Sequence, residues 1–192
     1  MTTPLYPTIQ KRINDAFDDL ITKQVIPCMF FNSGMPMRIK KHDGKQIHYE
    51  GVGFEGSPEQ VFWSRYIEPF MEEICVNEIE LAVKKASEKG VDAKLLLPEV
   101  EQLLLSGIRK TYKEMAITDQ RIKGKGFPDK IPLKPIDNKC SSMKDFIHTR
   151  IKSELEMWKP SSKLKLLYKE YEHIVWIIGA ILAIGGIIAS IV

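Results

Sequence analysis

The first strong pattern in this chain is a set of apolar residues spaced three and four positions apart near its start. The set comprises Ile9, Ile13, Phe17, Leu20, Ile21 and Val25. Residues with this spacing share one face of an α-helix, so the pattern predicts an amphipathic helix whose apolar side faces a core. Pro7 suits the first turn of such a helix, and Pro27 is expected to end it.

A different pattern follows between about residues 37 and 54. Two short runs, one with Ile39 and the other with Ile47 and Tyr49, lie on either side of Asp43-Gly44. An Asp-Gly pair suits the central positions of a hairpin turn, where both residues need a positive φ angle. We therefore expect one β-hairpin here, the only strong strand signal in the chain.

A second helix is expected after the hairpin. The sequence Ser57-Pro58-Glu59-Gln60 combines a capping serine, a proline in the first turn and a glutamine three residues after the serine. The pattern then continues toward Gly90, which suits a helix C-terminus; its apolar members are Val61, Phe62, Tyr66, Phe70, Ile74 and Leu81. Pro69 is expected to kink this helix or to divide it in two.

Two more helices complete the expected domain. The first runs from Pro98 to about Arg121, with Val100, Leu103, Leu104, Ile108 and Met115 facing inward. The second is capped by Ser141 or Ser142, and its apolar residues are Met143, Phe146, Ile147, Ile151, Leu155 and Trp158. The fold class predicted for residues 1–160 is therefore mainly α with one β-hairpin insertion, in a single domain with its own core.

The last nineteen residues, 174–192, contain no charged side chain. At about 1.5 Å per residue, a helix of this length covers roughly 28 Å, close to the ~30 Å thickness of the hydrocarbon layer of a bilayer. The run predicts a single C-terminal transmembrane helix. A buried core helix and the removable tail of a lipid anchor are the alternatives, and a charged, aromatic flank in place of a small-residue attachment site disfavours the second.

The segment before this run, residues 161–173, is rich in lysine and aromatic side chains. With the neighbouring Lys159 and Trp176, it supplies the expected membrane-interface residues, which are Lys159, Lys163, Lys165, Tyr168, Lys169, Tyr171 and Trp176. Lysines on one side of a span mark the cytoplasmic side. The expected localisation is thus the membrane, single-pass, with the N-terminal domain in the cytoplasm, and three widely spaced cysteines agree with a reducing compartment.

Charge is divided unevenly along the chain. Residues 1–106 hold 12 Lys and Arg against 16 Asp and Glu, whereas residues 107–173 hold 16 against 9. A basic half next to a span favours contact with an anionic leaflet. A nucleic-acid partner is unlikely, because the loop that carries Lys123, Lys125, Lys130 and Lys134 has only Phe127 for base stacking.

Candidate chemistry is weak throughout. His42 and His48 flank the expected turn, with Asp43 or Glu50 as a conceivable third metal ligand, but exposed polar side chains are the simpler interpretation. The carboxylates Glu68, Glu72, Glu73, Glu78 and Glu80 lack Glu-x-x-His spacing and are expected to form a solvated helix face. No phosphate-binding, dinucleotide-binding or nucleophile-elbow motif occurs, so we expect no catalytic residue, metal or cofactor.

One surface of the predicted span is patterned. Gly179, Ala183, Gly186 and Ser190 are spaced four, three and four residues apart, so they share one face of a helix. Small residues let two helix backbones approach closely in lipid, which predicts association between spans. Gly and Ala are also common in spans that do not associate.

The function expected from these patterns is that of a tail-anchored, single-span protein that forms homo-oligomers through its span. Its cytoplasmic domain is expected to bind or sense an unknown protein partner, and the oligomer to act as a membrane-perturbing, pore-type bacterial effector. The alternatives are a membrane-tethered scaffold or adaptor and a membrane-tethered enzyme with a dispersed active site.

Overall fold

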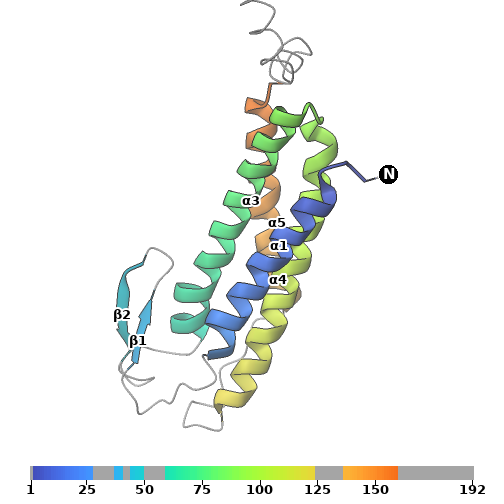
Figure 1. Ribbon diagram of the computed structural model, residues 1–192. Coiled ribbons are helices and arrows are strands. Elements are labelled where there is room, and N and C mark those ends of the chain that lie inside the picture. Colours follow the sequence, from blue (N-terminus) through green and yellow to red (C-terminus); the bar gives the residue numbers. More distant parts are fainter. Residues whose placement is uncertain (1, 28–36, 41–43, 50–58, 124–135, 160–192) are drawn as a thin grey trace, which may run out of the picture.

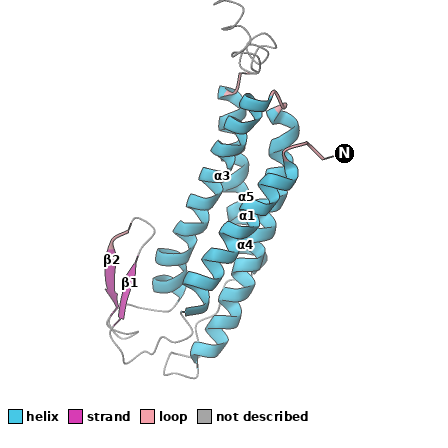
Figure 2. Ribbon diagram, in the orientation of Figure 1, coloured by secondary structure: helices cyan, strands magenta, loops and turns pink. Residues whose placement is uncertain are grey.

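A computed structural model of the chain describes residues 2–27, 37–40, 44–49, 59–123 and 136–159 (Figure 1). This part of the chain is mainly helical (Figure 2). Its long elements are α1 (Tyr6–Leu20), α3 (Glu68–Lys89), α4 (Ala93–Lys123) and α5 (Ile136–Met157). Two shorter π-helical segments, η1 (Ile21–Val25) and η3 (Glu59–Ile67), follow α1 and precede α3.

The four α-helices form an elongated bundle in which each helix runs opposite to the previous one (Figure 1). Helices α3 and α4 pack against each other, and both also pack against α1 and α5. In Figure 1, α3 and α4 therefore lie on opposite sides of the bundle, with α1 in front and α5 behind. The N-terminus, the α3–α4 turn and the end of α5 all lie at the same end of the bundle.

Local periodicity predicted the first helix well. All six apolar residues expected to face inward from Ile9 to Val25 are buried, and Pro7 lies in the first turn of α1. In α5 the expected Met143, Ile147 and Ile151 are likewise buried. Both stripes lie in the core because burial of aliphatic side chains provides the main driving force for packing these helices together.

The starts of α4 and α5 differ from the predictions. Helix α4 begins at Ala93, five residues before Pro98. Asp92 caps this start, because the Lys94 N–H donates to Asp92 Oδ1 at 2.9 Å. Helix α5 begins at Ile136, so Ser142 lies inside the helix, where its hydroxyl donates to the Asn138 carbonyl at 3.3 Å. Pro98 is tolerated because complete burial of the two leucines immediately before it, at positions 96 and 97, favours the helix there.

The expected division at Pro69 and the expected stop at Gly90 are both present in the structure. Pro69 lies in the first turn of α3, and the helical residues before it form η3, so the helix is divided at this point as expected. Gly90 ends α3 in the left-handed conformation, with φ of +67°, which glycine adopts without a steric penalty. Ser57 and Pro58, the expected start, lie outside the described residues.

Two strands lie beside the lower part of the bundle in Figure 1. Strand β1 (Met37–Lys40) pairs antiparallel with β2 (Gln46–Tyr49), and Ile39 lies opposite Ile47. Gly44 between them has a φ of +81°. Asp43 and residues 50–54 of the expected hairpin lie outside the described residues.

None of the described helices is long and apolar enough to cross a bilayer. The predicted span, residues 174–192, lies outside the described residues, as do residues 161–173.

Candidate functional site

The residues predicted to associate in the membrane, Gly179, Ala183, Gly186 and Ser190, are outside the described part of the chain. The same applies to all the predicted interface residues except Lys159. Lys159 is exposed and lies two residues beyond the end of α5. The end of α5 lies at the same end of the bundle as the N-terminus and the α3–α4 turn.

The expected carboxylate face of α3 is only partly a solvated surface. Glu72, Glu73 and Glu80 are exposed, but Glu78 is buried and Glu68 is partly buried. Glu78 belongs to the inward stripe of α3, at the same register as Cys75 and Ala82. The helical spacing of Glu78 with these apolar residues is the sequence signal that it is buried. The prediction that all five carboxylates are solvated overlooks this signal.

The buried carboxylate has a cationic partner on another helix. Arg12 of α1 donates from Nε to Glu78 Oε2 of α3 at 2.5 Å, across 66 residues of sequence. Only 24% of the Arg12 side chain and 10% of the Glu78 side chain remain exposed. The pair links α1 to α3, since a buried charge is stable only when it is paired and hydrogen-bonded.

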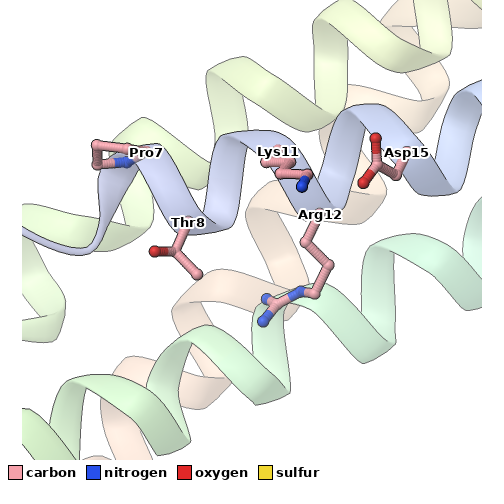
Figure 3. Close-up of a pocket in the computed structure, with 5 residues that line it drawn as sticks. All are labelled: Pro7, Thr8, Lys11, Arg12 and Asp15. Atoms are coloured by element: carbon pink, nitrogen blue, oxygen red, sulfur yellow. The ribbon is translucent and has the colours of Figure 1, made fainter.

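Arg12 also borders a shallow hollow of about 390 Å³ on the surface of α1. Pro7, Thr8, Lys11 and Asp15 line it together with Arg12, and Figure 3 shows the Arg12 side chain extending from α1 toward α3. Nη1 and Nη2 of Arg12 are buried and have no hydrogen-bond partner within the described residues. Thr8 and Lys11 supply exposed donors and Asp15 an exposed carboxylate, so the hollow is a mixed polar surface, open to solvent along one helix.

A second polar group joins α3, α4 and α5 near the other end of the bundle. Lys139 Nζ donates to Glu68 Oε1 at 2.5 Å and lies 5.6 Å from the centre of the Tyr112 ring. The Tyr112 hydroxyl donates to the same Glu68 oxygen at 3.4 Å. Burial, reinforced by the Glu68 charge, raises the pKa of Tyr112 and keeps its phenol protonated.

The described cysteines are not activated nucleophiles. Burial, with a smaller contribution from Glu72, raises the pKa of Cys75 to about 12. Burial also raises the pKa of Cys140, although Arg109 opposes the shift. Because the thiolate is the reactive form, both thiols are inert at neutral pH.

Two further polar contacts join the C-terminal part of the described chain to α3. Arg150 of α5 bonds to Glu80 of α3 and, at 2.9 Å, to Glu154 of its own helix. Trp158 Nε1 donates to Ser87 Oγ at 3.2 Å. Within the described residues no group of three or more His, Cys, Asp or Glu side chains could hold a metal ion. His42 and Glu50 lie outside those residues, and for His48 only its place on β2 is described.

Thr3 anchors the segment before α1 to α4. Its N–H donates to Glu99 Oε1 at 3.0 Å and its hydroxyl to Glu99 Oε2 at 2.6 Å. The polar side chains described here therefore position helices, and the hollow beside Arg12 is one place where they also meet solvent. Comparison of the chain with protein-family models, with curated proteins and with solved structures gives no match.

Proposed function

We propose that this protein is a single-span membrane protein whose copies associate through the span and whose helical bundle is held at the cytoplasmic surface. The observation that carries the proposal is the uncharged run of residues 174–192, preceded by lysines and then by aromatic residues. Cations followed by aromatics and then hydrocarbon is the order found at the cytoplasmic end of a membrane span.

The bundle is suited to act as the interaction module of such a protein. Its core is made of aliphatic and aromatic side chains, and its interior polar groups bond helix to helix. Charged side chains cover its outer surface. A rigid bundle with charged faces offers surfaces for a partner and needs no cofactor for that role.

Association is assigned to the small-residue face of the span, Gly179, Ala183, Gly186 and Ser190. Close packing of two backbones along this face stabilises an oligomer, because lipid provides no hydrophobic force between helices. In the sharper form of the proposal the oligomer perturbs the bilayer as an effector. A scaffold would use the same assembly to concentrate bundles at the surface.

The decisive experiment compares full-length protein with the double variant Gly179→Leu, Gly186→Leu in liposomes. Leucine raises the hydrophobicity of the span, so the variant should resist extraction with alkaline carbonate as the parent does. Each contact between spans contributes only about 0.6–2 kcal/mol, so cross-linking should show smaller species and not complete dissociation. The matched control, Ile181→Leu with Ile188→Leu, should keep the parent distribution.

Other outcomes would remove the span or the association face, and dye release distinguishes the membrane-perturbing form of the proposal from the scaffold. Carbonate extraction of the parent protein would show that residues 174–192 do not span the membrane. Unchanged oligomers in the glycine variant would remove the association face. Release of an enclosed dye by the parent, but less by the variant, supports the membrane-perturbing form, whereas intact liposomes with oligomers present support the scaffold.

A further inference from the structure

The outward face of α4 is strongly basic. Its exposed side chains include five cations, Lys94, Arg109, Lys110, Lys113 and Arg121, together with exposed glutamines and the aliphatic residues Leu95 and Ile117. No carboxylate of α4 is exposed among the residues whose exposure is described: Glu99, Glu101 and Glu114 are partly buried. We call this surface the α4 face.

Two cations of the α4 face have acidic partners on neighbouring helices. Lys110 pairs with Asp18 of α1 at 2.6 Å, and Arg109 lies 3.7 Å from Asp137 of α5. Both pairs are exposed, so each contributes little and exchanges readily with other counterions. Lys113 forms no ion pair with any described residue. The centre of the face thus keeps its positive charge.

The opposite side of the bundle is acidic at the same height. In the first half of α3, the exposed charged residues are Glu72 and Glu73, without an exposed Lys or Arg; Glu80, just beyond, is paired with Arg150 of α5. The hydrogen bond from Tyr112 to Glu68 sets the register of the antiparallel α3 and α4. Glu72 and Glu73 therefore lie within about one turn of the level of Arg109. At this level the bundle consequently carries positive charge on α4 and negative charge on α3, whereas the second half of α3 also exposes Lys84 and Lys89.

The α4 face also exposes apolar side chains. Among the described residues the large exposed hydrophobic side chains are Leu95 (66% exposed), Ile117 (39%) and Met157, and the first two belong to α4. Exposed aliphatic residues set among cations are typical of a surface that rests on lipid headgroups. A surface for single-stranded nucleic acid would instead present aromatic rings for stacking, but Tyr112, the aromatic residue of α4, is buried.

From these observations we propose that the α4 face docks on an anionic lipid surface, so that the bundle lies along the membrane with α3 facing away. The inference rests on the proposed function, because a span nearby raises the effective concentration of lipid. Residues 160–173 number fourteen, which reach at most about 46 Å when extended. That reach equals the length of α4, about 46 Å for 31 residues, so the span and the α4 face can engage together.

The test places a fluorescent probe on each side of the full-length protein. Gln102→Cys puts the probe on the α4 face, and Asn77→Cys puts it on α3 at the same level, both at exposed positions. Cys28→Ser provides the background, since Cys75 and Cys140 are buried. The labelled proteins are reconstituted in phosphatidylcholine vesicles with or without phosphatidylglycerol, and the vesicles carry a headgroup-attached quencher.

We expect several-fold stronger quenching at position 102 than at position 77 in vesicles with phosphatidylglycerol, and little difference in its absence or at high salt. Neutralising the face with Arg109→Gln, Lys110→Gln and Lys113→Gln should abolish the difference. The matched control replaces three exposed lysines elsewhere, Lys84, Lys144 and Lys152, with glutamine and should retain it. Circular dichroism verifies that both triple variants are folded.

Equal quenching at both positions, or stronger quenching at position 77, would overturn the proposal. The proposal would also be overturned if an oligonucleotide, but not phosphatidylglycerol, changed the fluorescence of the probe at position 102. That result would identify the α4 face as a nucleic-acid surface. If alkaline carbonate releases the protein, the prediction that residues 174–192 span the membrane is wrong, but the α4 proposal still stands. Salt-sensitive flotation with anionic vesicles, lost in the α4 triple variant, then decides the α4 proposal alone.

Discussion

At the scale of single residues, charge is accommodated inside this bundle where helices meet. Arg12 and Glu78 compensate each other between α1 and α3, and the other two guanidinium nitrogens of Arg12 are buried without a described partner. A lone buried charge is much more costly than a pair, so the two residues depend on each other. Their pairing explains how a glutamate occupies the apolar stripe of α3.

Replacing Glu78 by alanine should lower the free energy of unfolding by about 2–3 kcal/mol, because it leaves the Arg12 guanidinium uncompensated. This is less than for a fully enclosed pair, since about a quarter of Arg12 is exposed. The double variant Arg12→Met, Glu78→Leu should recover most of the loss. Urea unfolding followed by circular dichroism measures both, and a double variant less stable than Glu78→Ala would contradict this account.

The buried thiol of Cys75 predicts a loss of stability in alkali. Its pKa is raised from 9.0 to about 12, so above pH 9 the thiol ionises in the unfolded chain before it does so in the folded one. The stabilisation is complete below pH 9 and is lost between pH 9 and about 12, at up to ~1.4 kcal/mol per pH unit. Thermal unfolding measured across this pH range should show the unfolding temperature falling as the pH rises. The Cys75→Ala variant should show a smaller decrease.

At the scale of elements, the approach of α1 to α4 depends on a residue without a side chain. A Cβ atom at Gly107 would lie 2.2 Å from Cδ2 of Phe17 and 2.5 Å from its Cγ. The Phe17 ring is buried and cannot move aside freely. Phe17 and Gly107 together therefore set how closely the two parallel helices pack.

Gly107→Ala should destabilise the bundle by about 1–3 kcal/mol, the usual range for added bulk in a packed core. Helix propensity favours alanine over glycine by up to about 1 kcal/mol. The sign of the measured change in the free energy of unfolding therefore tests whether packing dominates. The neighbouring exposed Ser106→Ala serves as the control and should change stability by less than about 0.5 kcal/mol. An alanine variant as stable as the parent in thermal unfolding would mean that α1 shifts to accommodate the methyl group.

At the scale of the whole molecule, the core lies between Ile9 and Ile151 and involves all four helices. The fold of the bundle is thus expected to be independent of residues 174–192. Deleting these residues should leave the protein in the supernatant after high-speed centrifugation, with helical circular dichroism and cooperative unfolding retained. Loss of helical signal would show that the apolar run belongs to the core.

The sequence by itself determined the helical class, the first helix and the end of α3. These features arise from neighbours along the chain: the spacing of Ile9, Ile13 and Phe17, and the left-handed conformation that glycine permits at position 90. The apolar run of residues 174–192 is equally local, and its interpretation as a span remains a prediction from the sequence.

Only the tertiary structure decided where α4 and α5 begin and which charges are buried. The early start of α4 follows from burial of Leu96 and Leu97 against other helices, which outweighs the local effect of Pro98. The Arg12–Glu78 pair joins residues 66 positions apart, and no local pattern specifies such a partner. The opposition of a basic α4 face to an acidic α3 side likewise depends on the packing of α3 against α4, because periodicity defines the faces of each helix but not which helix lies beside it.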